Sequence, residues 1–312
     1  MDDLAIIIAT RNRVDKLSKL LESINLLAEK PGQVIIVYSG DEVSSATDIF
    51  KYSINLTINK SFIENQIEQK FIGIGLLNKN INWVLFLDDD ITVPINALEI
   101  LSIKYLKNPN FADVYGFGLK IRGLEYRQRS KAVLFFLRFC GLYSNVSGAV
   151  LKSGHAQNYQ NSLIDIETKW LNGISIWRTE ALQHYSSRFS KIDYSAYEDV
   201  IFSYKISQNN RLIFASAVAV VNQNREVYYP LSFIQYRAGT YMRFIFVSEN
   251  KELSKIKFLN AQFFRGLDFI INGELNIPLH LKLRKVCYIW CDLFLAILLK
   301  KDGMKLLRKR YN

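Results

Sequence analysis

Two hydrophobic periods alternate along the first hundred residues. The continuous apolar run at 4–9, residues 33–38, which are apolar after Gln33, and the continuous apolar run at 83–87 have the length and composition of buried strands. Residues 54–58 alternate like a further strand. Between the first two runs, apolar residues recur at helical spacing from Val14 to Leu27, and a second such pattern covers residues 67–77. Strands that alternate with helices indicate an α/β fold with a doubly wound, mostly parallel sheet.

Polar residues follow three of these strands at the point where each one ends. The first strand runs into Thr10-Arg11-Asn12-Arg13, the second into Ser39-Gly40-Asp41, and the fourth into Asp88-Asp89-Asp90. Since ligands bind at the carboxyl ends of parallel strands, we expect these tips to share one edge of the sheet. Glycine-rich signatures of a dinucleotide site or a P-loop are absent from the sequence, so neither is indicated.

Three adjacent carboxylates repel one another unless water or a cation neutralises them. An extended chain would place Asp88 and Asp90 on one side and turn Asp89 away. Oxygen ligands of this kind suit Mg²⁺ or Mn²⁺, which bind one or two carboxylates and complete their shell with phosphates and water. A solvated acidic turn, or a cap on the helix expected near Asn96, is the alternative. Because the three aspartates come at the end of a buried strand, we favour the interpretation that they bind a cation.

A second acidic motif lies in YEDVIFSYKIS, residues 197–207. Val200, Ile201 and Tyr204 have helical spacing, which places Glu198 and Asp199 at the helix start, where the dipole favours negative charge. Capping explains one acid but not two. The motif follows the stretch WLNGISIWRTEAL at residues 170–182.

The motifs ATRNR, LDDDI, WLNGISIWR and YEDVIFSYKI, in this order, resemble the family 2 glycosyltransferases of the GT-A fold, which include bacterial polysaccharide and O-antigen transferases. The resemblance covers roughly residues 4–225. It implies a metal-dependent enzyme of the hexosyl- or deoxyhexosyltransferase type that uses a nucleotide-diphosphate sugar donor. The acceptor would be a hydroxyl of a glycan or a lipid-linked saccharide in cell-surface polysaccharide synthesis, and transfer would invert the anomeric centre.

The resemblance also implies roles for individual residues. Asp199 matches the catalytic base, and Glu198 would support it or contact the acceptor. Asp90 matches the ligand of a divalent cation, Mn²⁺ or Mg²⁺, and Asp88 would belong to the same metal site. A loop between sugar and acceptor is matched by Trp170, Asn172 and Gly173. The donor-binding residues would be Thr10, Arg11, Arg13, Asp41, Lys70, Asp88 and Asp89. Structural alternatives remain open: a surface charge for Arg13, a helix cap for Glu198 and core packing for Trp170.

The chain also departs from the family pattern. Lys70 and Phe71 stand where arginine and asparagine are usual, and YSGDE replaces an aspartate-rich turn, which places base recognition by Asp41 in question. Asn222 and Gln223 occupy the region where some relatives carry a histidine metal ligand, so we expect no histidine ligand. Two rival functions remain. A nucleotidyltransferase would need a glycine-rich phosphate loop that TRNR does not provide, and a catalytically inactive scaffold would have no need of two intact acidic motifs.

Composition and charge bear on location. The chain has 312 residues, 49% of them hydrophobic, and three cysteines without CxxC spacing, which favours a globular protein in a reducing compartment. The N-terminus has the wrong charge order for a secretory signal, so a cytoplasmic protein is expected. The net charge of the chain is +11. Residues 281–312 contain nine Lys or Arg and two Asp, so the tail carries +7 of this charge.

The sequence therefore predicts two parts, a GT-A domain over residues 1–225 and a helical C-terminal region over residues 226–312 with a basic amphipathic tail. The apolar run at residues 286–299 is shorter than the roughly 20 residues of a membrane span, contains Asp292 and is flanked by Lys and Arg clusters. This pattern favours peripheral docking on the cytoplasmic face of the cell membrane. A helix packed on the domain is the alternative. Nucleic acid is not an expected partner, because the basic residues are not interleaved with aromatics.

Overall fold

The computed structural model describes residues 1–50, 53–123, 130–185, 197–223, 233–272, 278–284, 286–287 and 290–291. The chain divides into two compact units. The first comprises Met1–Tyr126, Asn158–Lys191 and Glu198–Val227, and the second comprises Arg127–Gln157, Ile192–Tyr197 and Tyr228–Asn312. The two domains expected from the sequence, divided at residue 225, stay a prediction. The second unit also includes residues 127–157, which a single boundary does not capture.

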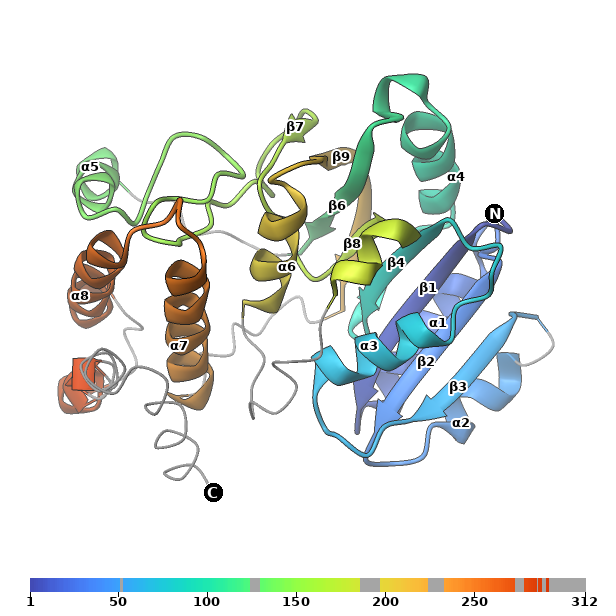
Figure 1. The fold of residues 1–312 in the computed structure, drawn as a ribbon. Coiled ribbons are helices and arrows are strands. Elements are labelled where there is room, and N and C mark those ends of the chain that lie inside the picture. The colour runs from blue at the N-terminus through green and yellow to red at the C-terminus, as the bar shows by residue number, and fades with distance from the viewer. Residues whose placement is uncertain are drawn as a thin grey trace. The chain divides into compact units, whose positions relative to one another are not determined.

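The first unit contains a nine-stranded sheet (Figure 1). Four parallel strands lie in the order β3 (Leu56–Lys60), β2 (Gln33–Ser39), β1 (Leu4–Arg11) and β4 (Trp83–Asp88). The sheet continues through β8 (Ser175–Arg178), β6 (Val114–Arg122), β9 (Arg211–Asn222) and β5 (Ile91–Thr92), and β7 (Ile166–Glu167) also pairs with β9. Strand β8 is antiparallel to β4 and β6, whereas β6 and β9 are parallel. The mixed α/β fold with a mostly parallel central sheet is confirmed.

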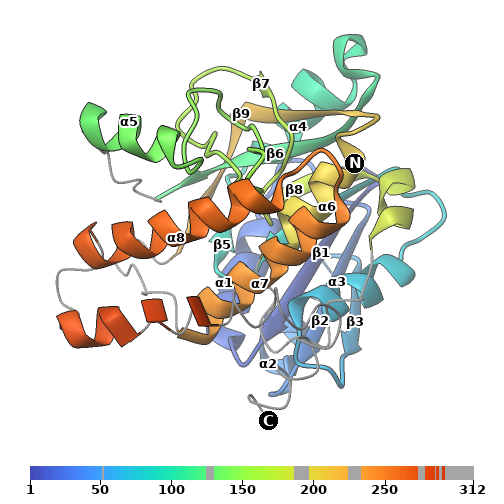
Figure 2. The same ribbon diagram turned by 60° about the vertical axis from the view of Figure 1, so that its left-hand side comes forward.

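Helices cover both faces of this sheet (Figure 2). Successive residues of a strand point to opposite faces, so Ile6 and Ile8 of β1 join the core beneath α1 (Val14–Asn25), α2 (Ser44–Thr47) and α4 (Ala97–Leu101). Ile7 joins the other core, with α3 (Gln66–Gly75), α6 (Glu198–Ile206) and the 3₁₀ turn Thr179–His184. Burial on both faces explains why β1 is a continuous apolar run. Shorter helical turns are Asp48–Phe50, Ser102–Leu106 and Pro109–Phe111.

The second unit is helical in its described part. It contains α5 (Lys131–Phe139), α7 (Phe233–Glu249), α8 (Lys255–Asn272) and helical residues at 279–284, 286–287 and 290–291. Helix α5 packs on α8 through an edge-to-face contact of Phe136 with Phe264, with ring centroids 5.5 Å apart. None of the helices within the described ranges is both long and apolar enough to cross a membrane. Most of the predicted basic tail, residues 292–312, lies outside the described residues.

The tips of β1 and β2 fit closely at Gly40. The backbone of Gly40 has φ +81°, and a Cβ there would lie 1.9 Å from Asn12 Oδ1. That oxygen accepts a hydrogen bond of 2.8 Å from the backbone N–H of Asp41. The left-handed backbone therefore favours glycine at this position, and a side chain there would also displace the Asn12 amide from its hydrogen bond with Asp41.

We expect Gly40→Ala to lower the free energy of unfolding by about 1–3 kcal/mol, because the variant combines strained backbone with a steric overlap. Chemical denaturation measures the change. Gly75→Ala is a matched control, since Gly75 ends α3 and a Cβ added there would meet no atom within 4 Å. Alanine favours a helix over glycine, so the control should be neutral or slightly stabilising. Equal losses in both variants would contradict this account of Gly40.

Candidate active site

A buried carboxylate joins the tips of β1 and β4. Asp89 accepts hydrogen bonds from Thr10 Oγ1 at 2.7 Å and from Arg13 Nη1 at 2.9 Å. Burial raises the pKa of the Asp89 carboxyl, although both of these partners act in the opposite direction. Thr10 and Arg13, expected to contact the donor, therefore both hold the central residue of the acidic turn.

The two flanking aspartates have different neighbours. Asp88 Oδ1 accepts a hydrogen bond of 2.9 Å from Gln66 Nε2 of α3. Asp90 Oδ2 lies 3.7 Å from Arg13 Nη1 and 3.9 Å from Lys16 Nζ. Asp90 thus shares Arg13 with Asp89, which differs from the simple alternation expected from the sequence. The reason is that extended backbone ends at Asp88, where β4 gives way to a turn.

Gln223 fixes this turn from the end of β9. Its side-chain amide donates to the carbonyl oxygens of Ile91 at 2.9 Å and Lys16 at 3.3 Å, and its backbone N–H donates to Asp90 O at 2.8 Å. No histidine ligand is expected from the sequence after this strand, and the structure places there Gln223, a residue that holds the backbone of the turn in place. Apart from the place of Gln223 after a predicted strand, no signal in the sequence marks that role.

Lys70 of α3 brings a buried positive charge to the same strand ends. Its side chain is 3% exposed, and Nζ lies 5.4 Å from the ring centroid of Phe86 and 3.9 Å from Glu198 Oε1. The ammonium group makes no hydrogen bond with any residue that the structure describes. Because the described residues neutralise this buried ammonium group only in part, an anionic ligand would stabilise it.

The second acidic motif faces this lysine from the start of α6. Tyr197, immediately before the helix, has φ +79°, an unusual backbone for an aromatic residue. Burial raises the pKa of Glu198 more than the attraction of Lys70 lowers it. Burial, followed by the charge of Glu198, raises the pKa of Asp199 to about 7. A carboxylate with this pKa is suited to accept a proton near neutral pH.

The loop at residues 170–173 completes the surroundings. The backbone N–H of Asn172 donates to Tyr159 Oη at 2.7 Å, whereas both polar atoms of the Asn172 side chain are buried without a partner in the described part of the chain. A Cβ on Gly173 would lie 3.8 Å from Lys70 Nζ and 4.0 Å from Asp88 Oδ2. The loop therefore lies close to both charges, at distances that would still accommodate a Cβ. Ser203 of α6 ties the loop to the helix by donating to Leu171 O at 3.3 Å.

These groups surround one small cavity in the first unit. It is lined by Lys70, Phe86, Asn172, Gly173, Ser175, Trp177, Tyr185, Glu198, Asp199, Phe202 and Ser203. The hydroxyl of Tyr185 is buried and has no hydrogen-bond partner among the described residues. Burial and the neighbouring carboxylates Glu198 and Asp199 raise the pKa of this phenol. Tyr185 was missed in the sequence, because nothing in its local pattern marks it.

Other predicted residues lie at the strand tips but do not line this cavity. Arg11 is exposed and forms an ion pair with Glu64. Asp41 is also exposed, and its backbone binds Asn12. The ring of Trp170 packs on Tyr159 with centroids 4.9 Å apart, which agrees with the packing alternative.

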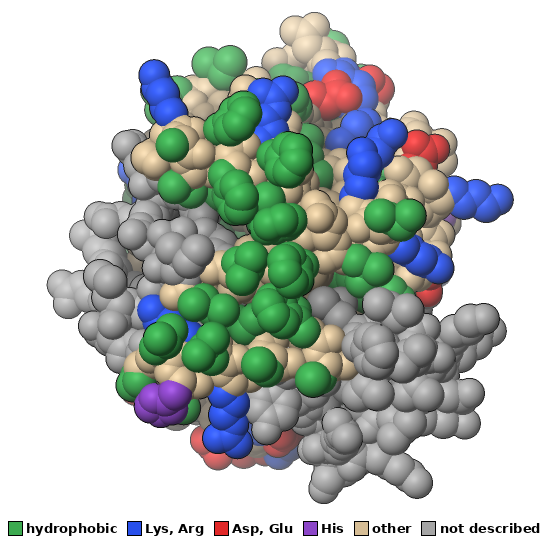
Figure 3. All heavy atoms as spheres, turned by 90° about the vertical axis from the view of Figure 1, so that its left-hand side faces the viewer, with side chains coloured by type: hydrophobic (Ala, Val, Ile, Leu, Met, Phe, Trp, Pro, Cys, Tyr) green, Lys and Arg blue, Asp and Glu red, His purple; other side chains and the backbone are tan. Residues whose placement is uncertain are grey.

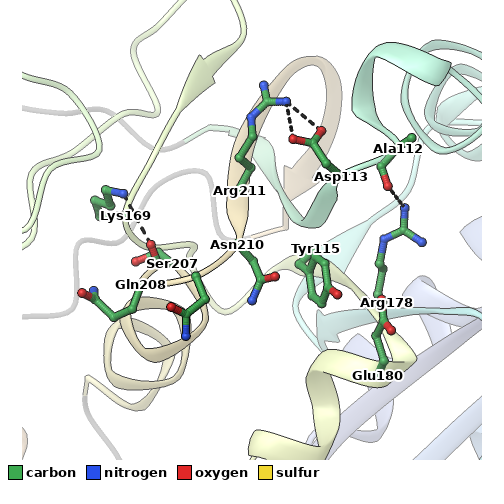
Figure 4. A pocket seen from close by; sticks show the side chains of 11 residues that line it. Ala112, Asp113, Tyr115, Lys169, Arg178, Glu180, Ser207, Gln208, Asn210 and Arg211 are labelled. Atoms are coloured by element: carbon green, nitrogen blue, oxygen red, sulfur yellow. Dashed lines mark hydrogen bonds and ion pairs between the residues drawn. The ribbon is translucent and has the colours of Figure 1, made fainter.

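A second, open groove lies at the opposite edge of the sheet (Figure 4). It is formed where β6 and β9 begin and where β8 ends beside the start of β4. Asp113 and Arg211 form a bidentate ion pair there at 2.7 and 3.0 Å, and Arg178 donates to Ala112 O at 2.7 Å. None of the predicted site residues lines this groove.

The acidic turn fits a divalent cation that also takes ligands from its substrate. Among the described residues, no three His, Cys, Asp or Glu side chains converge into a complete metal site. Asp88 and Asp90 offer two carboxylates from one turn, which is the number that Mg²⁺ typically takes before phosphates and water fill its shell. The buried ammonium of Lys70, which like Asp88 adjoins Gly173, is suited to the anion that such a cation would share.

Comparisons by sequence gave no match, either to a protein family or to a curated protein. By structure, the chain is similar to S. aureus TarS 1-349, with a TM-score of 0.58 and 15% identity over 94% of this chain and 80% of the TarS 1-349 chain. TarS has also been solved with UDP-GlcNAc. The mannosyltransferase PcManGT from Pyrobaculum calidifontis, solved with GDP-Man and Mn²⁺, gives a TM-score of 0.56 and 15% identity over 99% of this chain and 79% of the other. The chain therefore has a GT-A-like fold.

The raised pKa of Asp199 predicts a pH-dependent stability. The folded chain binds the Asp199 proton more tightly than the unfolded chain does, so protonated Asp199 stabilises the fold. This stabilisation is complete below the unfolded pKa, about 3.9, and is lost as pH rises through the folded pKa of about 7. In metal-free buffer, the free energy of unfolding should fall by roughly 3 kcal/mol more in the wild type than in Asp199→Asn between pH 4 and 8. Chemical denaturation at several pH values measures this difference. Parallel curves for the two proteins would argue against a buried, protonated Asp199.

Proposed function

We propose that the chain is a divalent-cation-dependent, inverting glycosyltransferase of the family 2 type. The observation that carries the proposal is the placement of Asp199, with a pKa of about 7, in a cavity shared with Lys70 and with the unpartnered amide of Asn172. The acidic turn of β4 borders this arrangement, because Gly173 adjoins both Lys70 and Asp88. A base, a cation site and a buried positive charge are the parts that sugar transfer from a diphosphate requires.

In this proposal Asp199 removes the proton from the acceptor hydroxyl while the hydroxyl oxygen attacks the anomeric carbon. The bond from that carbon to the diphosphate oxygen breaks, and its electron pair leaves with the diphosphate. One base acting opposite the leaving group inverts the anomeric centre. Burial, and then like-charge repulsion from Glu198, hold the pKa of Asp199 near neutrality. Asn172, with both amide atoms unsatisfied, is placed to hydrogen-bond sugar hydroxyls.

Donor binding is assigned to the acidic turn and Lys70. Asp90 and Asp88 would hold Mn²⁺ or Mg²⁺, which neutralises charge on the departing diphosphate. Lys70 would contribute a fixed positive charge from the protein side. Arg13 and Thr10 would act by orienting the turn through Asp89, to which both are hydrogen-bonded. Arg11 and Asp41 remain candidates for the nucleoside, since both sit on exposed strand tips.

The acceptor proposed from the family resemblance is a glycan or lipid-linked saccharide, with the enzyme on the cytoplasmic face of the membrane. UDP- and GDP-sugars are the donors to test first, because the TarS and PcManGT structures contain UDP-GlcNAc and GDP-Man. The nucleotidyltransferase alternative lacks support from the tip of β1, where side chains rather than a glycine-rich backbone face the acidic turn. Metal-dependent hydrolysis of a donor by the purified chain would exclude an inactive scaffold.

Asp90→Ala should abolish cation-dependent binding of the donor nucleotide, because the diphosphate loses its shared ligand. Calorimetry with UDP and GDP, with and without Mn²⁺, measures this effect. Glu99→Ala is a suitable control, since Glu99 is an exposed acid of α4 to which we assign no part of the donor site. If Asp90→Ala keeps wild-type affinity and its cation dependence, Asp90 is not the ligand.

Asp199→Asn should retain donor affinity but lower the rate of sugar transfer or donor hydrolysis by at least about a hundredfold, because an amide cannot accept the proton. Glu198→Gln should behave differently. Removing the like charge lowers the pKa of Asp199, so the rising limb of the pH–rate profile should move to lower pH. A profile unaltered by Glu198→Gln, or full turnover in Asp199→Asn, would refute these roles.

A further inference from the structure

The second unit presents exposed apolar side chains from segments far apart in the sequence. Helix α5 contributes Phe135, 77% exposed, and Phe139, 80% exposed, and α8 contributes Ile256, 80% exposed, and the partly exposed Phe263. The helical residues 279–284 add Leu279 and Leu283, which lie about one turn apart on the same side of that helix. We call these six side chains the apolar face. Figure 3 shows hydrophobic side chains gathered in a band on this side of the molecule.

Contacts within the second unit hold these segments side by side. Helix α5 rests on α8 through Phe136 and Phe264, and Asn260 Nδ2 of α8 donates to Cys140 O, just after α5, at 3.5 Å. On α8, Phe263 stacks on Trp290 with centroids 4.9 Å apart, and Gly266 allows close approach of Val286 and Trp290. The apolar residues of α5 and α8 therefore lie on two helices packed together, with residues 286 and 290 packed on α8, rather than as scattered single residues. Such surfaces mark interaction sites.

The charges on the same segments are strongly one-sided. Helices α5 and α8 and residues 279–284 carry seven Lys or Arg and one Asp. Lys131, Arg138, Lys255 and Lys257 are exposed and make no ion pair with the residues that the structure describes. Figure 3 shows Lys and Arg side chains around the hydrophobic band. An isologous interface with a second copy would bring these like charges together, which disfavours that occupant.

We propose that the apolar face and its surrounding lysines and arginines dock on an anionic phospholipid surface. Phenylalanine, leucine and isoleucine side chains would enter the boundary between head groups and acyl chains, while Lys and Arg bind the phosphates. The inference rests on the membrane location in the proposed function and deepens it by naming the surface. It adds α5, from the middle of the chain, to an interaction that the sequence assigned to the tail alone.

Flotation of the full chain with vesicles tests the proposal without donor or acceptor, so a failure of the enzymatic function does not affect the result. The wild type should bind vesicles that contain phosphatidylglycerol more strongly than vesicles of phosphatidylcholine alone, and salt should weaken the binding. The double variant Phe135→Ser/Phe139→Ser should lower the partition coefficient about tenfold or more. Leu163→Ser/Ile164→Ser is the matched control, because these apolar residues of the first unit are equally exposed.

Three outcomes would overturn the proposal. The first is equal flotation of the two double variants. The second is self-association of the wild type in solution that Phe135→Ser/Phe139→Ser abolishes while vesicles remain unbound, since a second copy then occupies the surface. The third comes from Lys255→Gln/Lys257→Gln, which removes two exposed charges without touching apolar packing. If this variant keeps wild-type binding to phosphatidylglycerol vesicles at low salt, the surface does not recognise anionic lipid. Circular dichroism and the thermal midpoint should be unchanged in all of these exposed-site variants.

Discussion

The position of the acidic groups depends on one buried carboxylate. Asp89 receives hydrogen bonds from Thr10 and Arg13, and so joins the end of β4 to the tip of β1 and the start of α1. A buried charge without partners would be costly, and these two donors make its burial tolerable. The turn is held from the opposite side by Gln223. Asp88 and Asp90 are thereby fixed on either side of a residue that cannot easily move.

The continuous strands could be predicted because both of their faces are buried. The central residues of β1, β2 and β4 are continuously apolar, with polar residues only at the strand ends, and the helical spacing of α1 follows from its single buried face. Strand β3 begins two residues later than expected, since its partly exposed residues give a weaker pattern. The two-residue strands β5 and β7 carry no periodicity at all. Helix α5 looked like part of the first domain, because its packing on α8 depends on contacts between residues more than a hundred positions apart.

The candidate site was predictable to the extent that its chemistry is local. Paired acids at a strand end and a helix start stand out in the sequence, as do the loop residues between them. Gln66, Tyr159, Tyr185 and Gln223 do not, because each becomes part of the site only through a tertiary contact. Lys70 was inferred from resemblance, and its burial against Phe86 and Glu198 could not be foreseen from spacing.

Electrostatic compensation in the cavity is incomplete in the protein alone. Glu198 and Asp199 lie together in a buried position with Lys70 as the nearest cation identified, and burial still raises the pKa of both acids. Asn172 and Tyr185 add polar atoms that have no partner among the described residues. Each such group destabilises the fold unless a ligand satisfies it. A ligand that supplied anionic oxygens to Lys70 and hydroxyls to Asn172 would therefore bind with little reorganisation, since the polar groups it requires are already buried and oriented.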